Sequence, residues 1–219
     1  MSAFSTPATA GRKKRGEGHT RREEILQAAK ELFLEQGYDA TTIRKIADRV
    51  GVSAPALYLY FQDKEQMMLA LCDQTFGHLI ESVEEIEKTV SDPRQRIRQF
   101  GEAYLRFGML HPDEYRLVFL GSNIPESVRK VGHRMPTDDP TRPGVQGAIV
   151  FQRLVAVLVE AEASGLKLNY PADNCAELCW MALHGLVSAF ILKPEFPWNR
   201  ELLINGMLDI VLKGVVRDA

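Results

Sequence analysis

Apolar residues recur with the 3.6-residue period of an α-helix along most of the chain. The first segment of this kind places on one face Ile25, Ala28, Ala29, Leu32 and Phe33. Thr20 and Glu23 have the spacing of a capping box, and Gly37 suits the left-handed residue that ends a helix. The pattern therefore predicts a helix over residues 21–36.

Two short helices are predicted next. Thr42 suits the cap of a helix over 43–50 that ends at Gly51, and Ser53 suits the cap of a second helix that runs to about Tyr60. Helices this short are not stable alone, so we expect both to pack on the first helix. The residues expected to do so are Ile43, Ile46, Ala47, Val50, Val52, Leu57 and Phe61. This arrangement is a helix-turn-helix, whose second helix enters the major groove of DNA.

The rest of the chain continues the helical period without a clear linker. Asp63 suits the cap of a long helix, and the further predicted helices cover 64–88, 93–110, 112–120, 126–131, 145–164, 171–192 and 199–216. Most of residues 121–144 is predicted to be loop, because this stretch holds four prolines. The fold class is therefore all-α, with an N-terminal helix-turn-helix joined through a long helix to a C-terminal helical domain. The predicted boundaries are 1–19 for a disordered basic arm, 20–66 for the helix-turn-helix and 67–219 for the remainder.

The last two predicted helices have more apolar surface than one protein core requires. In the helix over 171–192, polar residues are confined to one narrow stripe, so it is expected to be buried on more than one side. Small residues that permit close helix approach occur at Gly185, Ala189, Gly206 and Gly214. We expect these two helices to form half of a four-helix interface in a homodimer.

Composition excludes several classes of protein. With 45% hydrophobic and 26% charged residues, the chain is neither disordered nor collagen-like. The longest uncharged apolar stretch, Leu178–Leu192, is shorter than the roughly 20 residues of a membrane span. A cytoplasmic protein without a membrane span is expected. Residues 1–22 hold six Lys and Arg but one acidic residue, which is consistent with either a solvated tail or an arm on DNA phosphates.

The second short helix of the helix-turn-helix has an outward face that packing does not explain. Leu57 and Phe61 are expected to point inward, which leaves outside Ala54, Pro55, Ala56, Tyr58 and Tyr60. Tyrosine hydroxyls donate hydrogen bonds to phosphate oxygens, and small apolar groups contact thymine methyl groups. Arg44, Lys45 and Lys64 flank this face, where phosphates would lie.

At these residues the chain resembles the TetR (tetracycline repressor) family of bacterial regulators, over roughly Thr20–Gln66. The shared pattern includes Thr42-x-x-x-Ile46-Ala47-x-x-x-Gly51-Val52-Ser53 and Leu57-Tyr58-x-Tyr60-Phe61-x-x-Lys64-Glu65. The resemblance implies a homodimer that reads a pseudo-palindromic DNA operator, with a C-terminal domain that dimerises and binds a small-molecule inducer. It also implies phosphate contacts for Thr42, Arg44, Tyr58 and Lys64, and base-edge contacts for Ala54, Pro55, Ala56 and Tyr60. The full set of predicted DNA-binding residues is Thr42, Arg44, Lys45, Ser53, Ala54, Pro55, Ala56, Tyr58, Tyr60 and Lys64.

Trp180-x-x-x-His184-Gly185 resembles a subset of the family with a Trp-His-Gly signature in its C-terminal domain. The resemblance does not name a ligand. We expect a mostly apolar ligand cavity lined by Tyr104, Phe107, Phe151, Trp180 and His184, because a buried histidine needs a polar partner. Plain core packing is the alternative for each of these aromatic residues.

Metal binding and catalysis are poorly supported by the sequence. Cys175 and Cys179 are one helical turn apart, but His184 lies about 140° around the helix from Cys179, so buried thiols are expected. No nucleophile with an adjacent base is found, and neither a cofactor nor an enzymatic activity is predicted. The resemblance implies a regulator that is usually a repressor, and we expect one that is released from DNA by a small, largely apolar ligand. An activator or a ligand-independent regulator with the same DNA-binding segment is the first alternative, and a helical small-molecule binding protein or enzyme is the second.

Overall fold

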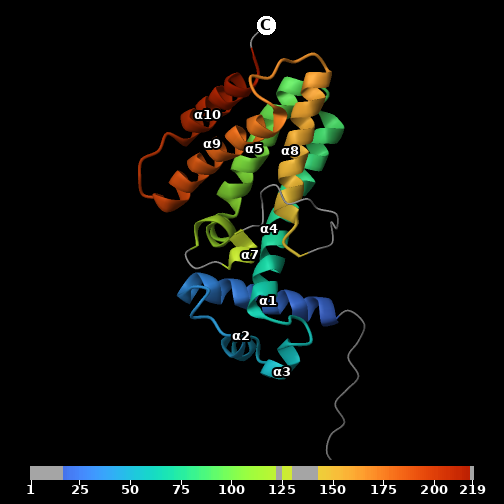
Figure 1. Ribbon diagram of the computed structural model, residues 1–219. Coiled ribbons are helices and arrows are strands. Elements are labelled where there is room, and N and C mark those ends of the chain that lie inside the picture. The colour runs from blue at the N-terminus through green and yellow to red at the C-terminus, as the bar shows by residue number, and fades with distance from the viewer. Residues whose placement is uncertain (1–16, 122–124, 130–142, 218–219) are drawn as a thin grey trace, which may run out of the picture.

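The computed structural model describes residues 17–121, 125–129 and 143–217, and within these ranges its regular elements are helices (Figure 1). They are α1 (Glu17–Gln36), α2 (Ile43–Val50), α3 (Ala54–Leu57), α4 (Lys64–Thr89), α5 (Pro93–Leu110), α6 (Pro112–Tyr115), the π-helical segment η1 (Arg116–Leu120), α7 (Glu126–Arg129), α8 (Gln146–Ala163), α9 (Ala172–Leu192) and α10 (Arg200–Val215). An isolated antiparallel bridge pairs Leu168 with Val216 near the end of the chain. The predicted all-α fold is confirmed.

The molecule has a small head at one end and a larger helical body (Figure 1). We use "head" for residues 17–63, which contain α1 to α3, and "body" for the described residues from 64 onward. Helix α4 begins beside the head and runs into the body, where it packs against α5 and α8. One continuous buried core extends from α1 through α4 to α10. Movement of α4 therefore affects both parts.

Local hydrogen bonds define the helix ends in the head, as the sequence predicts. The Thr42 side chain accepts a hydrogen bond from the Lys45 amide at 3.2 Å, and Ser53 accepts one from the Ala56 amide at 3.3 Å. Gly51 has φ of 72°, a left-handed conformation that favours glycine and ends α2. These short side-chain caps fix the turn between α2 and α3.

The structure corrects several predicted boundaries. Helix α1 begins at Glu17, so Thr20 lies inside the helix and does not cap it, and residues 17–19 of the predicted arm are helical. Residues 1–16, which include most of the basic arm, lie outside the described residues. Helix α3 ends at Leu57 rather than near Tyr60, because the chain tightens into three-residue turns such as the 2.9 Å bond from the Tyr60 amide to the Leu57 carbonyl.

The region around α6 also differs from the sequence prediction. A single helix was expected over 112–120, but α6 ends at Tyr115 and the chain widens into the π-helical η1. The helix expected over 126–131 is present as Glu126–Arg129, and residues 130 and 131 lie outside the described part of the chain.

Helix α9 lies deep in the body and packs against α5, α8 and α10. Of the helices in the described residues, it alone is long and apolar enough to cross a membrane by length and composition. In a soluble protein the same composition is explained by burial on several sides, and α9 contributes nine buried residues to the core. The predicted burial of this helix on more than one side is confirmed.

Candidate DNA-binding face and ligand cavity

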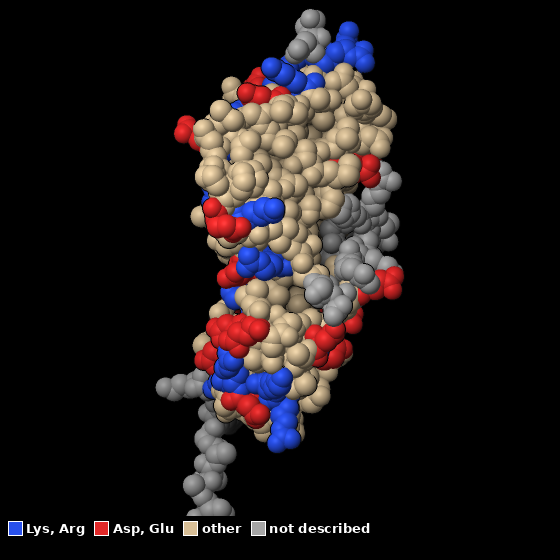
Figure 2. Space-filling view, turned by 90° about the vertical axis from the view of Figure 1, so that its left-hand side faces the viewer, with Lys and Arg blue, Asp and Glu red and all other residues tan. Residues whose placement is uncertain are grey.

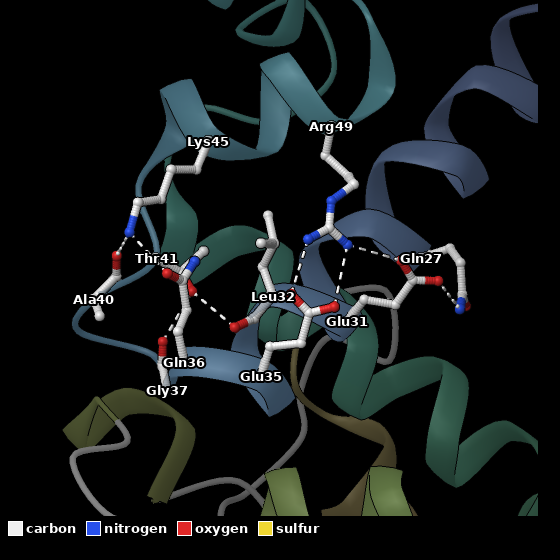
Figure 3. Close-up of polar contacts among 10 residues, drawn as sticks. All are labelled: Gln27, Glu31, Leu32, Glu35, Gln36, Gly37, Ala40, Thr41, Lys45 and Arg49. Atoms are coloured by element: carbon white, nitrogen blue, oxygen red, sulfur yellow. Dashed lines mark hydrogen bonds and ion pairs between the residues drawn. The ribbon is translucent and has the colours of Figure 1, made fainter.

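Polar contacts join α2 to α1 within the head (Figure 3). The Arg49 guanidinium contacts Glu31 at 3.3 Å and Glu35 at 2.8 Å, and this ion pair holds the pKa of Glu35 below its usual value. The Lys45 ammonium donates to Gln36 Oε1 at 2.7 Å and to the Ala40 carbonyl at 2.8 Å (Figure 3). Arg49 therefore forms ion pairs and Lys45 forms hydrogen bonds within the head, although the Lys45 side chain remains exposed.

Lys64 has a different environment from the one expected of a residue that flanks the recognition helix. Its ammonium donates to the Tyr38 carbonyl at 2.5 Å and the Thr41 carbonyl at 3.0 Å, and it lies 4.0 Å from the centre of the Tyr38 ring. Burial lowers its pKa. The turn between α1 and α2 presents these carbonyls to the start of α4, so Lys64 links α4 to this turn of the head rather than extending freely toward solvent.

Six exposed residues define what we call the recognition face: Thr42, Arg44, Ser53, Pro55, Tyr58 and Leu59. Arg44 makes no hydrogen bond or ion pair with any described residue, so its charge is free to meet an anion. Tyr58 is 53% exposed and Leu59 is 84% exposed. Ala54, Ala56 and Tyr60 are only half-buried, and both Ala54 and Tyr60 pack against the core, so the structure makes Tyr60 less accessible than the sequence suggested.

A small apolar cavity lies in the body between α5, α8, α9 and α10, and its lining also includes Phe76 of α4 and Phe119 of η1. Its volume is about 40 Å³, enough for a few water molecules. Of the predicted ligand-binding residues, Tyr104, Phe151 and Trp180 line the cavity. Gly101 also lines it, and a Cβ at this position would lie only 2.8 Å from Leu208 Cδ2.

Phe107 and His184 are not among the residues that line this cavity, and their part in ligand binding stays a prediction. Phe107 stacks on Phe76 with a centroid distance of 5.9 Å and belongs to the core. The His184 ring stacks on Trp180 at 5.0 Å, behind the cavity wall. Its Nδ1 lies 2.5 Å from the Tyr115 hydroxyl oxygen, so the polar partner expected for this histidine is present.

The two cysteines of α9 are buried thiols in the core. Burial raises the pKa of Cys179 to about 12, so the thiolate that a metal requires is scarce at neutral pH. Cys175 hydrogen bonds to the Tyr170 carbonyl at 3.3 Å. These environments support the packing interpretation of both residues.

Comparison with known proteins agrees with the geometry of both parts. Residues 25–71 match the family model described as "Bacterial regulatory proteins, tetR family". Residues 97–209, more than half of the chain, match "Tetracyclin repressor-like, C-terminal domain". The chain belongs to the TetR family. This places it among transcriptional regulators rather than enzymes. Membership of the subset with a Trp-His-Gly signature stays a prediction.

Named TetR-family relatives include both an activator and a repressor of transcription. The chain is 38% identical over 106 residues to the HTH-type transcriptional activator FasR of Mycolicibacterium smegmatis, which is 48% of each chain. It is 40% identical over 65 residues to the HTH-type transcriptional repressor AcnR of Corynebacterium diphtheriae, covering 30% of this chain and 34% of that one. The matches thus span about half the length of these relatives or less.

A solved structure shows the same fold over nearly the whole molecule. The transcriptional regulator FadR of Bacillus subtilis, in complex with stearoyl-CoA, superposes with a TM-score of 0.70 at 19% identity. The superposition covers 88% of this chain and 98% of FadR. It supports the arrangement of a TetR-family head on a helical body.

The TetR-family body has a broad face with few charged side chains on the side of α9 and α10 (Figure 2). Its exposed apolar residues include Leu178, Met181 and Leu192 of α9 and Leu202 and Ile210 of α10. Gly185, Gly206 and Gly214 have open space where a Cβ would lie, which leaves room for close approach of another helix.

Leu59 is a recognition-face residue that the sequence reading missed. The signal was present, because Leu57 and Phe61 are four residues apart on the buried side and Leu59 lies between them. An apolar residue in that position has to point outward when its neighbours at both ends point inward. Its high exposure places an apolar contact beside Tyr58 on this TetR-family head.

Replacing Lys64 tests its position in the head. Lys64→Met keeps the apolar stem but removes two hydrogen bonds from a charged donor, so we expect the free energy of unfolding to fall by about 1–3 kcal/mol. Urea denaturation measures this change. Operator affinity should be close to that of the unmodified protein at temperatures where the variant is folded. Normal stability with weakened DNA binding would instead assign Lys64 to a phosphate contact.

Proposed function

We propose that this regulator binds a pseudo-palindromic operator as a homodimer and leaves it when a small, largely apolar ligand enters the body. The observation that carries the proposal is that one helix joins the two candidate sites. Helix α4 begins at Lys64 in contact with the head, and its Phe76 lines the cavity. A ligand that moves Phe76 can therefore change the position of the head.

The recognition face supports DNA binding through its chemistry. Arg44 supplies an unpaired cation for a phosphate, and the hydroxyl groups of Thr42, Ser53 and Tyr58 supply further donors. Pro55 and Leu59 supply apolar groups that can contact thymine methyl groups in the major groove. The other predicted residues are proposed to support this face and are weaker candidates for direct contact with DNA. The Lys45 ammonium is already hydrogen-bonded within the head, and the side chains of Ala54, Ala56 and Tyr60 are half-buried.

The face of α9 and α10, which carries few charged side chains (Figure 2), supports a homodimer. Large exposed apolar areas mark interaction sites on soluble proteins, and the glycines of this face permit close helix packing. A four-helix interface formed by two copies would bury the apolar side chains and place two heads on successive turns of DNA. Burial of this face in a dimer also accounts for the apolar composition of α9 without a membrane, and we infer that the protein acts in the cytoplasm.

The small volume of the cavity supports regulation by a ligand. At about 40 Å³ it is far smaller than the roughly 300 Å³ of a small-molecule site, so its walls have to separate to admit a ligand. The bound and free conformations consequently differ, as a ligand-responsive regulator requires. The stearoyl-CoA complex of FadR supports an acyl chain as one ligand of suitable character.

The cavity is tested by filling it. We expect Phe151→Trp to raise the stearoyl-CoA concentration needed for operator release by at least about tenfold, since the added ring occupies the ligand space. Affinity for an operator selected from random duplexes should change by less than about threefold in the absence of ligand. Fluorescence anisotropy of labelled operator measures both quantities.

Tyr170→Trp is the matched control, because it adds an indole at a site that is 54% exposed. An unchanged response of Phe151→Trp would place the ligand elsewhere. Failure of the unmodified protein to bind any duplex in a salt-dependent manner would overturn the DNA-binding part of the proposal.

Activation of transcription is a second candidate, and the relationship to the activator FasR favours it. A repressor occupies an operator that overlaps the promoter, whereas an activator binds upstream of it. Footprinting combined with transcription in vitro, with and without the protein, separates these two functions.

A further inference from the structure

The second helix of the helix-turn-helix lacks the side chains that most often identify bases in DNA. Residues 53–61 include α3 and the turn that follows it, and they contain no Arg, Lys, Asn, Gln, Asp or Glu. Guanine is most often recognised by Arg or Lys, and adenine by Asn or Gln, each through two hydrogen bonds to one base. This segment therefore has no side chain that can identify guanine or adenine in that way.

The hydroxyl groups of the recognition face carry little information about base sequence. Thr42 Oγ1 accepts a hydrogen bond from the Lys45 amide at 3.2 Å, and Ser53 Oγ accepts one from the Ala56 amide at 3.3 Å. Each of these oxygens is thus engaged in a helix cap, and its hydrogen can be donated to any acceptor, including a phosphate oxygen. The Tyr58 hydroxyl both donates and accepts, so it does not by itself distinguish one base from another.

Apolar groups occupy the exposed side of the same segment. Pro55 is exposed, Tyr58 is 53% exposed and Leu59 is 84% exposed. The Tyr58 amide donates to the Ala54 carbonyl at 3.4 Å and the Leu59 amide to the Ala56 carbonyl at 3.3 Å, so the chain keeps a helical course beyond α3. Residues three and four apart lie on the same side of such a turn. Pro55, Tyr58 and Leu59 therefore form one surface, which we call the apolar patch.

The position of the apolar patch favours a partner outside the chain. Figure 1 shows α3 at the end of the head that faces away from the body. Leu57 and Phe61 are the buried residues of this segment, so the apolar surface of Leu59 is removed from water only when a partner covers it. Among the base edges of the major groove, the apolar group is the C5 methyl group of thymine.

We propose that the apolar patch reads the operator through the methyl groups of thymine, with Leu59 as the principal contact. The inference rests on the DNA binding proposed above and specifies which chemical group of DNA is recognised. Arg44 and the hydroxyl groups hold phosphates, while the patch selects base pairs whose methyl groups lie against it. Hydrogen bonds from residues 53–61 to guanine or adenine contribute little to the choice of sequence. 5-Methylcytosine carries a methyl group at the same ring carbon and can replace thymine at a position read in this way.

The first experiment removes single methyl groups from the DNA. An operator is selected from random duplexes with the unmodified protein, and each thymine is then replaced with deoxyuridine, which lacks only the C5 methyl group. We expect affinity to fall about fourfold when the methyl group read by Leu59 is removed from one half-site, and about 15-fold when it is removed from both. Thymines outside the contacted positions should tolerate the replacement within about 1.5-fold. Fluorescence anisotropy of labelled duplexes measures these affinities.

The second experiment assigns the methyl contact to Leu59. Leu59→Ala shortens a side chain that is largely exposed, so the fold should be unchanged, and thermal unfolding checks this. The variant should bind the thymine operator about 15-fold more weakly, and should bind the thymine and deoxyuridine duplexes within about 1.5-fold of each other. Leu110→Ala, at the exposed end of α5, is the matched control and should keep both the affinity and the deoxyuridine effect.

Arg44→Gln separates the methyl contact from the phosphate contact. Removal of the charge should weaken binding to the thymine and deoxyuridine duplexes to the same extent, so their ratio should stay at about fourfold for each half-site. Loss of this ratio in Arg44→Gln would overturn the division between a phosphate contact at Arg44 and a methyl contact at the apolar patch.

A restored methyl group tests the inference in the opposite direction. The contacted T·A pair is replaced with C·G, which removes the methyl group and changes the hydrogen-bonding groups of the base pair. Methylation of that cytosine at C5 adds back the methyl group alone and should raise affinity about fourfold for each half-site. In Leu59→Ala the same methylation should raise affinity by less than about 1.5-fold.

Failure of the proposed function has a different result from failure of this inference. If no duplex is bound in a salt-dependent manner, the DNA-binding function fails and the inference fails with it. If an operator is bound but no deoxyuridine replacement in its half-sites lowers affinity by more than about 1.5-fold, the function stands and methyl recognition is overturned. If the deoxyuridine effect keeps its full size in Leu59→Ala, the assignment to Leu59 is wrong.

Discussion

A carboxylate introduced at position 206 is expected to convert the proposed dimer into a monomer. Gly206→Glu places the new side chain where a Cβ has no neighbour within 4 Å, so the protomer itself can accommodate it. Burial of an unpaired carboxylate against an apolar partner is strongly unfavourable, and the dimer should dissociate. Sedimentation velocity measures the change in mass. Operator affinity should fall by about 100-fold or more, because a monomer binds DNA through a single head and loses the gain in affinity that two linked heads provide.

The control for this variant is Val159→Glu on α8, where the parent side chain is 50% exposed. It introduces the same charge on an exposed helix outside the proposed interface and should leave the dimer intact. If Gly206→Glu remains dimeric and Val159→Glu dissociates, the interface lies on α8 instead of on α9 and α10.

Reversing the charge of Arg44 is expected to weaken binding to every DNA sequence. The Arg44→Glu dimer loses one phosphate contact in each head and gains two repulsive charges, so affinity should fall roughly 100-fold on operator and on random duplex alike. The slope of log K against log salt should decrease by about 2, since two fewer phosphates are neutralised. Titrations at several salt concentrations measure both effects.

Arg106→Glu provides the same charge reversal on an exposed part of α5 away from the recognition face. It should change DNA affinity and its salt dependence only slightly. A loss for Arg44→Glu that is confined to the operator would mean that Arg44 contacts base edges, and the phosphate assignment would be wrong.

The sequence predicted the features of the fold that depend on local chemistry. Thr42 and Ser53 cap the helices expected of them, because a cap requires only a side-chain oxygen and an amide three residues away. Gly51 ends α2 because glycine readily adopts the left-handed conformation found at this position, which is also a local property. Periodicity also predicted the burial of α9, since an apolar surface on most of a helix has to be covered.

Features that depend on contacts between distant segments could not be predicted in this way. Lys64 contacts carbonyls of the turn at Tyr38 and Thr41, and no spacing rule relates them. For the ligand site, periodicity indicated that Phe107 and His184 face the interior but not which side of the interior has free space. That distinction depends on packing within about 1 Å, as the closeness of Gly101 to Leu208 illustrates.

The small volume of the cavity has a consequence for the kinetics of induction. A free space of about 40 Å³ is far below the roughly 300 Å³ of a small-molecule site, so we expect a ligand to bind after the surrounding helices have moved apart. The observed association rate should then stop increasing at high ligand concentration and level off at the opening rate of the protein. Ligands of different affinity would share this limiting rate and differ mainly in how long they remain bound.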